Sequence, residues 1–267
     1  MVRAALAGVA GRMGSRIAQI IAESEGLTLA GGFERADHPK VGRDLAEVIG
    51  GPPTGLRVDG GIREVLEKAD VVIDFTAASV SLAHLREASS AKKPMVIGST
   101  GFTPDQLEQA RQMASSVPCV LAPNMSMGVN VLFKVVADVA RLLGPDFDVE
   151  IVEAHHRFKK DAPSGTAVKL AQVVAESLGR NLEEVGVYAR HGIIGERTGQ
   201  EIGVQTLRGG DIVGEHTVMF AGLGERIELI HRAHSRDNFA RGALRAALWV
   251  VRQPPGLYDM QHVLGIK

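Results

Sequence analysis

The stretch ALAGVAGRMG, residues 5–14, decides the fold of the first half of the chain. An apolar run leads into it and a helical pattern follows it. Gly11 and Gly14 match the last two glycines of the dinucleotide fingerprint G-x-G-x-x-G, whereas its first glycine is displaced by one residue to Gly8. Glycines permit a tight turn, and the amides at a helix start can receive a pyrophosphate. We therefore predict a dinucleotide-binding turn; the alternative is a turn that merely packs well.

Two charged residues follow the second apolar run, about 20 residues after the glycines, where the fingerprint expects an acidic residue. Glu34 is suited to the adenosine ribose hydroxyls, and Arg35 to a 2′-phosphate. Both NADH and NADPH therefore remain possible cofactors. The alternative for Arg35 and Arg12 is a solvated surface charge. The cofactor contacts predicted from this part of the chain are Gly8, Val9, Ala10, Gly11, Arg12, Met13, Glu34 and Arg35.

Short apolar runs alternate with helical patterns over the first 125 residues, which is typical of βαβ units and a parallel sheet. We predict strands over residues 2–7, 27–33, 71–75, 94–98 and 117–122. Ligands of such sheets bind beyond the carboxyl ends of the strands. Further cofactor contacts are thus expected towards the nicotinamide end, although packing glycines and ordinary turn residues are the alternative. They are Gly98, Ser99, Thr100, Ala122, Pro123, Asn124 and Met125.

The pattern changes after about residue 125. Helices are indicated over 128–143 and 165–178, with a strand at 148–154 between them. Residues 201–234 alternate with period two and carry glycine-rich turns, which predicts a second, largely antiparallel sheet. The tail over 239–251 is helical again, and the run QPPG at 253–256 is predicted to end this helix. Pattern alone leaves open which domain this tail packs against.

The densest polar cluster is EAHHRFKKDAPSGT, residues 153–166, which follows a predicted strand and runs into a predicted helix. A metal site is disfavoured, because no cysteine is near and adjacent histidines on a strand point to opposite faces. Histidine titrates near neutrality, lysines supply positive charge, and the helix start offers amides to a carboxylate. This combination indicates anion recognition with proton transfer. The alternative is an ordinary N-cap at Ser164 surrounded by solvated side chains.

Together these motifs resemble the bacterial 4-hydroxy-tetrahydrodipicolinate (dihydrodipicolinate) reductases over the whole chain. The resemblance rests on HHRFKKDAPSGTA at 155–167 and on the glycine turn, and it also covers FER at 33–35, GSTGF at 98–102, GDIVGEH at 210–216 and FARGA at 239–243. It implies catalysis by His155 and Lys159, and substrate contacts from His156, Lys159, Gly165 and Thr166. The reaction implied is NADH- or NADPH-dependent reduction of a small dicarboxylate in the diaminopimelate route to lysine. Which of His155 and Lys159 delivers the proton stays open.

The resemblance further implies an α/β organisation in two domains. A Rossmann-like parallel-sheet domain for the dinucleotide, residues 1–126, is completed by the tail, 237–267. Residues 127–236 form an α+β domain with a mixed, largely antiparallel sheet for substrate binding and oligomerisation. A homo-oligomer, commonly a tetramer, is implied as well.

Composition excludes several other function classes. The 267 residues carry 30 Lys and Arg against 31 Asp and Glu, so an electrostatic grip on nucleic acid is not expected. Apolar runs stay far below the roughly 20 residues that span a bilayer. We expect a cytoplasmic protein, and the single cysteine, Cys119, to be buried on a strand. Two rivals remain: another nicotinamide-dependent amino-acid or semialdehyde dehydrogenase, and a non-catalytic nucleotide-sensing regulator.

Overall fold

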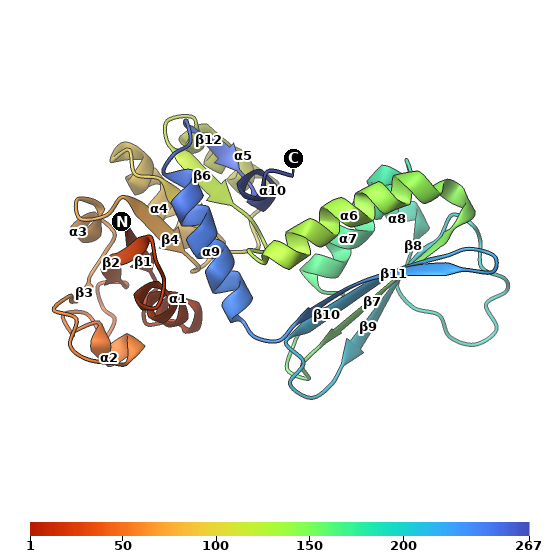
Figure 1. Cartoon of the computed structure of the whole chain (residues 1–267), viewed down its shortest axis with the longest axis horizontal. Helices are drawn as coiled ribbons and strands as arrows, with labels where there is room; N and C mark the ends of the chain where they lie inside the picture. Colours follow the sequence, from red (N-terminus) through yellow and green to blue (C-terminus); the bar gives the residue numbers. More distant parts are fainter. Residues whose placement is uncertain (267) are drawn as a thin grey trace. The chain divides into compact units, whose positions relative to one another are not determined.

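The computed structural model describes residues 1–266, which divide into two compact units (Figure 1). The first unit comprises Met1–Met127 together with the tail from Asp237 onward. The second comprises Gly128–Arg236. None of the helices among these residues is long and apolar enough to cross a membrane.

The first unit is built on a seven-stranded parallel sheet with the order β12-β6-β5-β4-β1-β2-β3. All five predicted strands are present, three of them shorter by one residue at one or both ends. The two unpredicted strands, β3 and β12, have two and three residues and are too short for a periodic pattern. The strands are β1 (Val2–Ala7), β2 (Leu27–Phe33), β3 (Val58–Asp59), β4 (Val71–Asp74), β5 (Met95–Ile97), β6 (Pro118–Leu121) and β12 (Gly256–Tyr258).

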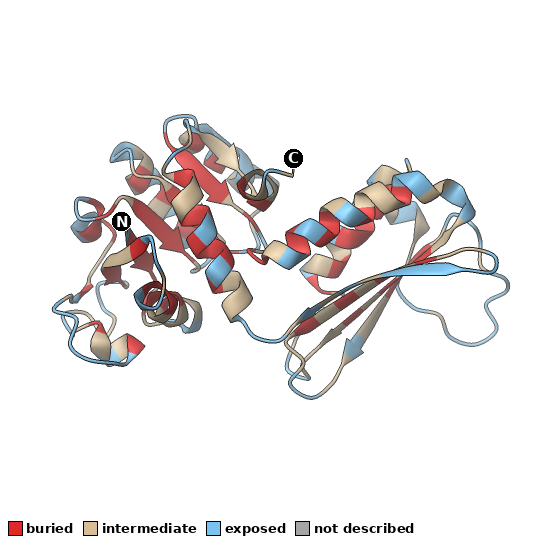
Figure 2. Ribbon diagram, viewed as in Figure 1, coloured by how far each residue is buried: buried red, intermediate tan, exposed pale blue. Residues whose placement is uncertain are grey.

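Helices cover both faces of this sheet. Successive residues of β1 point to opposite faces, so Ala4 and Leu6 join one buried cluster and Ala5 and Ala7 the other. The strands are accordingly buried in Figure 2. The first cluster holds α1 (Arg12–Ala22), α2 (Ala46–Ile49), α9 (Asp237–Val250) and α10 (Met260–Leu264); the second holds α3 (Arg63–Leu66), α4 (Ala78–Ser90) and α5 (Pro104–Ala114).

The C-terminal tail is part of this unit. Ala243 and Ala247 of α9 share the core of Ile17 on α1, and β12 pairs in parallel with β6. The prediction that the helix of the tail ends at residues 253–256 is confirmed, because α9 ends at Val250; β12 and α10, which follow the prolines, were not predicted. Cys119 is fully buried on β6, as expected.

The second unit contains a five-stranded mixed sheet with the order β11-β10-β7-β9-β8. β10 pairs antiparallel with β7 and β11, whereas β7 pairs in parallel with β9, and β9 with β8. The strands are β7 (Asp148–His155), β8 (Gly186–Val187), β9 (Ile202–Arg208), β10 (Gly214–Ala221) and β11 (Arg226–Ala233). The helices are α6 (Met127–Leu143), the 3₁₀ turn η1 (Gly144–Asp146), α7 (Gly165–Ser177) and α8 (Leu182–Val185).

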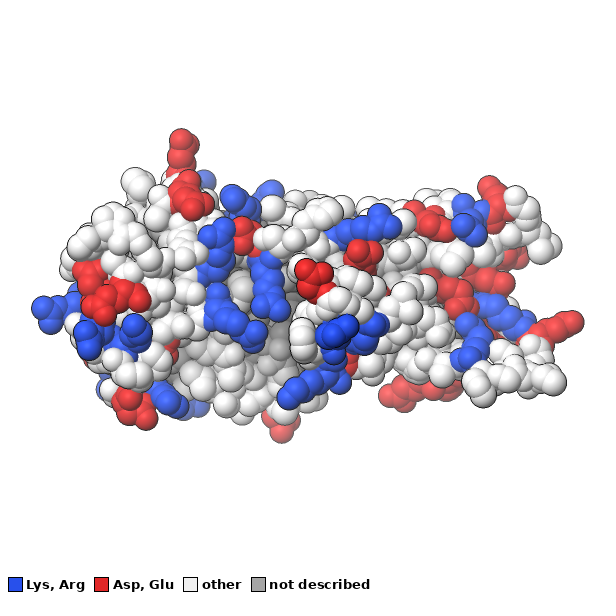
Figure 3. Space-filling view, turned by 90° about the horizontal axis from the view of Figure 1, so that it is seen from below, with Lys and Arg blue, Asp and Glu red and all other residues white. Residues whose placement is uncertain are grey.

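Helices α6 and α7 lie on one face of this sheet (Figure 1), and their apolar sides form a third core with it. The edge strand β11 is largely exposed (Figure 2). Acidic and basic side chains are both present on the face shown in Figure 3, in keeping with the balanced net charge.

Candidate active site

Three neighbouring strands of the second unit share a sheet face that is apolar at one end and polar at the other. Because side chains alternate along a strand, every second residue of β7, β9 and β10 points to α6 and α7. Glu153 lies opposite both Thr206 and His216, and His155 lies opposite Arg208. These five residues form the polar end. The apolar end consists of Val149, Ile151, Ile202, Val204, Val218 and Phe220.

Glu153 is the centre of the polar end and is fully buried. Both oxygens of its carboxylate accept from the guanidinium of Arg208, each at 2.9 Å. It also accepts from the Ser164 amide at 2.9 Å and the Thr206 hydroxyl at 3.3 Å. Burial raises the pKa of the Glu153 carboxyl, but the hydrogen bonds from Arg208, His155 and Ser164 outweigh burial and lower that pKa overall. Glu153 is therefore an anion at neutral pH.

His155 is the direct neighbour of this anion. Its Nδ1 lies 2.6 Å from Oε2 of Glu153. Burial lowers the pKa of His155. The hydrogen bond and the charge of Glu153 raise it, but burial together with the charges of Lys159 and Arg208 outweighs them, so the pKa is lowered overall and the ring is predominantly neutral at pH 7. Since Glu153 is ionised, the single ring proton lies on Nδ1 and Nε2 keeps its lone pair. Gly214 leaves room beside this atom, because a Cβ there would lie 3.0 Å from Nε2.

Lys159 and His156 flank His155. The Lys159 ammonium donates to both carboxylate oxygens of Asp161, at 2.9 and 2.8 Å. This pair lowers the pKa of Asp161. The ring of His156 lies 6.2 Å from that of the exposed Phe158, and its buried Nδ1 has no hydrogen-bond partner among residues 1–266.

The start of α7 is attached to the same cluster. The Ser164 hydroxyl caps the helix by accepting from the Ala167 amide at 3.2 Å. It also lies 3.1 Å from Nε2 of His216. Burial lowers the pKa of His216 to about 3, so this ring is neutral as well. A Cβ added at Gly165 would meet no atom within 4 Å, so the first helical residue borders open space.

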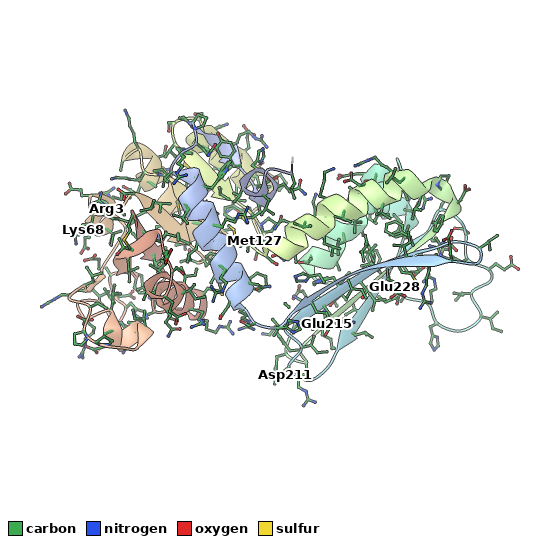
Figure 4. The ribbon with its side chains drawn as sticks, in the orientation of Figure 1. Arg3, Lys68, Met127, Asp211, Glu215 and Glu228 are labelled. Carbon is green, nitrogen blue, oxygen red and sulfur yellow. The ribbon has the colours of Figure 1, made fainter. Side chains whose placement is uncertain are left out.

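The turn between β9 and β10 supports the histidine segment from its backbone. The Gly209 amide donates to the His155 carbonyl at 3.0 Å, and the Arg157 amide donates to the Gly210 carbonyl at 3.2 Å. Asp211 lies in this turn (Figure 4). The turn motif and the histidine segment, more than 50 residues apart in sequence, thus form one local structure.

The glycine turn of the first unit has the geometry that a dinucleotide requires. Gly8 adopts a φ of +63°, and its carbonyl accepts from the Gly11 amide at 2.9 Å. A Cβ on Gly14 would clash with the Gly8 carbonyl, so only glycine fits there. Gly11 is the N-cap of α1 and offers no side chain to the helix amides. These amides are therefore available to an anion.

Glu34 and Arg35 follow β2 beside this turn. Oε1 of Glu34 accepts from the Ala10 amide at 2.8 Å and thereby stabilises the turn. Oε2 takes no part in this hydrogen bond and can bind a ligand. The Arg35 side chain is 75% exposed and pairs with Asp37 at 2.9 Å. Arg12 and Met13 begin α1, and Val9 packs against Gly32 of β2.

The residues after β5 and β6 are held tightly. A Cβ on Gly98 would clash with the ring of Phe75, so packing alone accounts for this glycine. Ser99 is buried, whereas Thr100 is exposed. Beyond β6, Asn124 Oδ1 accepts from the Ser126 amide at 2.9 Å. The neighbouring residues of that turn are Ala122, Pro123 and Met125.

Two family models cover nearly the whole chain. The model described as Dihydrodipicolinate reductase, N-terminus, matches residues 2–125, and that described as Dihydrodipicolinate reductase, C-terminus, matches residues 128–264. The chain belongs to the dihydrodipicolinate reductase family. The 4-hydroxy-tetrahydrodipicolinate reductases of Syntrophobacter fumaroxidans and Syntrophus aciditrophicus are 73% and 58% identical to it, each over 100% of both chains. The predictions of family and of an oxidoreductase are thereby confirmed.

Solved structures agree with this assignment. A dipicolinate-bound dihydrodipicolinate reductase from Paenisporosarcina sp. TG-14 has a TM-score of 0.77 and 28% identity, over 97% of both chains. GenD2 from gentamicin A biosynthesis, in complex with NAD, is 14% identical with a TM-score of 0.61 and shares the fold alone. The predicted α/β fold class is confirmed. Members of the dihydrodipicolinate reductase family use NADH or NADPH, so the prediction of a nicotinamide cofactor is confirmed as well.

Sequence reasoning assigned no role to four members of this polar end: Glu153, Thr206, Arg208 and His216. The sequence could have indicated Glu153. Val149 and Ile151 alternate with polar residues along the strand, so an apolar side chain is expected at position 153. A charged residue at such a position needs a buried partner. Arg208 is more than 50 residues away and is brought to it only by strand pairing.

Proposed function

We propose that this protein reduces 4-hydroxy-tetrahydrodipicolinate to tetrahydrodipicolinate with NADH or NADPH, in the diaminopimelate route to lysine. The observation that carries the proposal is the Glu153–His155 pair attached through Ser164 to the open start of α7, in a member of a reductase family. We assign cofactor binding to residues 1–126 and 237–267, and substrate binding and oligomerisation to residues 127–236.

The residues of the first unit fit a dinucleotide. The uncapped start of α1 suits the pyrophosphate, and the free oxygen of Glu34 suits the adenosine ribose. The bound nicotinamide supplies the hydride. The remaining contacts we assign to it are those predicted from the sequence: Gly8, Val9, Ala10, Gly11, Arg12, Met13, Arg35, Gly98, Ser99, Thr100, Ala122, Pro123, Asn124 and Met125.

In the second unit, we assign substrate binding to the open helix start and to the cations beside it. The amides of Gly165 and Thr166 can receive one carboxylate of the dicarboxylate. His156 has an unused buried nitrogen for the substrate. Lys159 is held by Asp161, whose side chain is 60% exposed, so a substrate carboxylate can compete for the ammonium. Two anionic groups on the substrate thus account for the richness of donors here.

The 4-hydroxyl group of the substrate leaves as water, the hydride adds to the ring, and the electron pair that this addition leaves on the ring must take up a proton. Neutral His155 carries its only ring proton on Nδ1, in the bond to Glu153, so it has none to give from Nε2. The Lys159 ammonium is therefore the group to which we assign proton delivery. Nε2 of His155 has no proton and therefore acts as a hydrogen-bond acceptor. By accepting this bond it orients the group that donates the hydrogen.

The direct test is a coupled assay in which a dihydrodipicolinate synthase produces the substrate and oxidation of NADH or NADPH is followed. Turnover with either cofactor supports the proposal. No turnover with this substrate, together with turnover of an amino acid or a semialdehyde, would favour another nicotinamide-dependent dehydrogenase.

We also propose that the protein is cytoplasmic and forms a homotetramer, without nucleic-acid or membrane partners. The family membership and the exposed edge strand β11 support an oligomer. Sedimentation velocity of the purified protein measures the oligomeric state directly.

Cofactor preference is expected to depend on Arg35. Arg35→Ala should raise KM for NADPH about tenfold and leave KM for NADH nearly unchanged, because only the 2′-phosphate requires the guanidinium. Steady-state kinetics with both cofactors measure this difference. Arg63→Ala, which removes a similarly exposed arginine paired with Glu87, is the matched control. Equal losses with both cofactors would instead give Arg35 a role in the fold.

The carboxylate site is expected to be sensitive at Gly165. Pyridine-2,6-dicarboxylate should inhibit competitively. Gly165→Val should lower the affinity for this inhibitor about tenfold or more, because the valine side chain would lie between the helix amides and the anion. Gly165 does not have a positive φ, and its Cβ position is open, so the variant should fold normally. Inhibitor affinity and Tm are measured together. Gly61→Val, equally open and in the other unit, is the control; unchanged inhibitor binding would contradict the site.

A further inference from the structure

A buried carboxylate in the first unit has no part in the mechanism above. Asp74 ends β4 and is fully buried. Its Oδ1 accepts from the amide and the hydroxyl of Thr76, at 2.8 and 2.6 Å, and from the Ser81 hydroxyl at 2.9 Å. Its Oδ2 lies 2.7 Å from Nδ1 of His84. A buried charge with this many donors is costly to assemble, which points to a specific use.

The chain of hydrogen bonds extends from Asp74 to the loop after β5. Oγ of Ser81 lies 2.7 Å from Oγ of Ser99. A hydroxyl has one proton to donate, and that of Ser81 goes to the carboxylate, which can only accept. The Ser99 hydroxyl must therefore be the donor to Ser81. Ser99 is itself buried, so this bond fixes the middle residue of the loop 98–100.

The position of the network in the sheet links it to one half of the cofactor site. The strand order reverses beside β1, with β2 on one side and β4 followed by β5 on the other. A dinucleotide lies across such a point. Glu34 and Arg35 follow β2 and are assigned to the adenosine half, so the residues after β4 and β5 lie on the nicotinamide side.

The same carboxylate also reaches the glycine turn. A Cβ on Gly8 would lie 2.9 Å from Cγ2 of Thr76, so the Thr76 methyl group packs directly against the turn. Asp74 thus holds Thr76 against the pyrophosphate turn and, through Ser81, holds Ser99 in the loop 98–100. The Asp74 carboxylate therefore determines the spacing between the glycine turn and the loop 98–100.

We propose that Asp74 and Ser81 are positioning residues for the nicotinamide half of the cofactor, acting through Ser99 on the loop 98–100. This inference rests on the proposed function, because it requires that a nicotinamide dinucleotide binds. A purely structural role would lower stability and would affect all ligands of the first unit alike. A positioning role affects ligands that contain nicotinamide more than those that lack it.

The test compares NADH with ADP-ribose, which has the adenosine and pyrophosphate but no nicotinamide. NADH affinity is measured by the change in its fluorescence on binding, ADP-ribose affinity by competition, and Tm is recorded for each variant. Ser81→Ala should raise the Kd for NADH roughly threefold to tenfold, the effect of losing one hydrogen bond. The Kd for ADP-ribose should stay within about twofold of the wild-type value. Ser99→Ala should show the same split, and Ser99→Thr, which keeps the hydroxyl, should restore NADH affinity.

The control is Ser90→Ala on the same helix, whose hydroxyl donates only to the Arg86 carbonyl at 2.9 Å. It should change neither affinity. Equal losses of NADH and ADP-ribose, or no loss of either, in Ser81→Ala and Ser99→Ala would overturn the inference and leave the proposed function standing. Failure of the wild-type protein to bind NADH or NADPH would overturn both. Should Ser81→Ala not fold, Ser81→Cys, which keeps a side chain of similar size but is a weaker hydrogen-bond donor, is measured in its place and is expected to show the same selective loss of NADH affinity.

Discussion

His155→Ala and Lys159→Ala should each lower kcat by a factor on the order of 10² to 10⁴, the usual contribution of a positioned proton donor for Lys159 and, for His155, of the group that keeps the reacting groups in position. For His155 the loss reflects removal of the Nε2 acceptor that the bond to Glu153 orients. For Lys159 it reflects removal of the cation to which we assign proton delivery. The measurement is kcat at saturating substrate and cofactor.

Stability should change little in both variants. Without His155, Glu153 still accepts from Arg208, Ser164 and Thr206, so no buried charge is left without partners. Lys159→Ala removes a pair with an exposed partner, which contributes little to folding. Lys160→Ala, at the adjacent position, is the control and should retain wild-type kcat. A kcat near the wild-type value in either test variant would remove that residue from the mechanism.

Much of the first unit could be predicted from the sequence because its signals are local. Strands buried on both faces appear as continuous apolar runs, and the glycine turn stands between one of them and a helix. The failures have the same origin. β3 and β12 have only two and three residues, and pairing with a neighbouring strand creates them rather than their own pattern.

The catalytic cluster shows where such reasoning stops. The histidine segment was recognised as a unit because its polar residues are contiguous. Its supporting residues come from other strands: Arg208 and Thr206 reach Glu153 through the parallel register of β7 with β9, and His216 through the antiparallel register with β10. Alternation along the strand is enough to place Glu153 on the same face as His155. Register depends on long-range pairing, so the residues that meet Glu153 from the other strands could not be assigned.

Glu153→Gln is expected to affect stability and activity in separate ways. The substitution keeps the shape of the side chain but removes the negative charge that Arg208 and the other donors require. Removing one partner of a buried ion pair typically costs about 3 to 5 kcal/mol of unfolding free energy, and the 20% exposure of the Arg208 side chain places this loss at the lower end, about 3 kcal/mol. Chemical denaturation at pH 7 measures it.

The pH dependence gives a second, independent readout. The folded protein lowers the pKa of Glu153 below the ordinary value of about 4.3, so the stabilisation is complete above that value and is lost as pH falls through the folded-state pKa. The glutamine variant has no such group. Its stability deficit relative to the wild type should therefore shrink as the pH is lowered from about 6 towards 3. A deficit that is constant over this range would mean that charge is not its cause.

Activity tests whether Glu153 also orients His155. The amide can offer an N–H as well as an oxygen to Nδ1, so it no longer fixes the ring proton there and Nε2 is no longer reliably an acceptor. We expect kcat to fall by a factor on the order of 10 to 10², by analogy with replacement of the carboxylate that hydrogen-bonds to a metal-bound histidine. Glu150→Gln is the control, because it lies on the same strand and pairs with Arg190 and Arg197, but points to the other face. If folded Glu153→Gln keeps its kcat at a temperature well below its Tm, Glu153 serves folding alone and His155 does not need it for orientation.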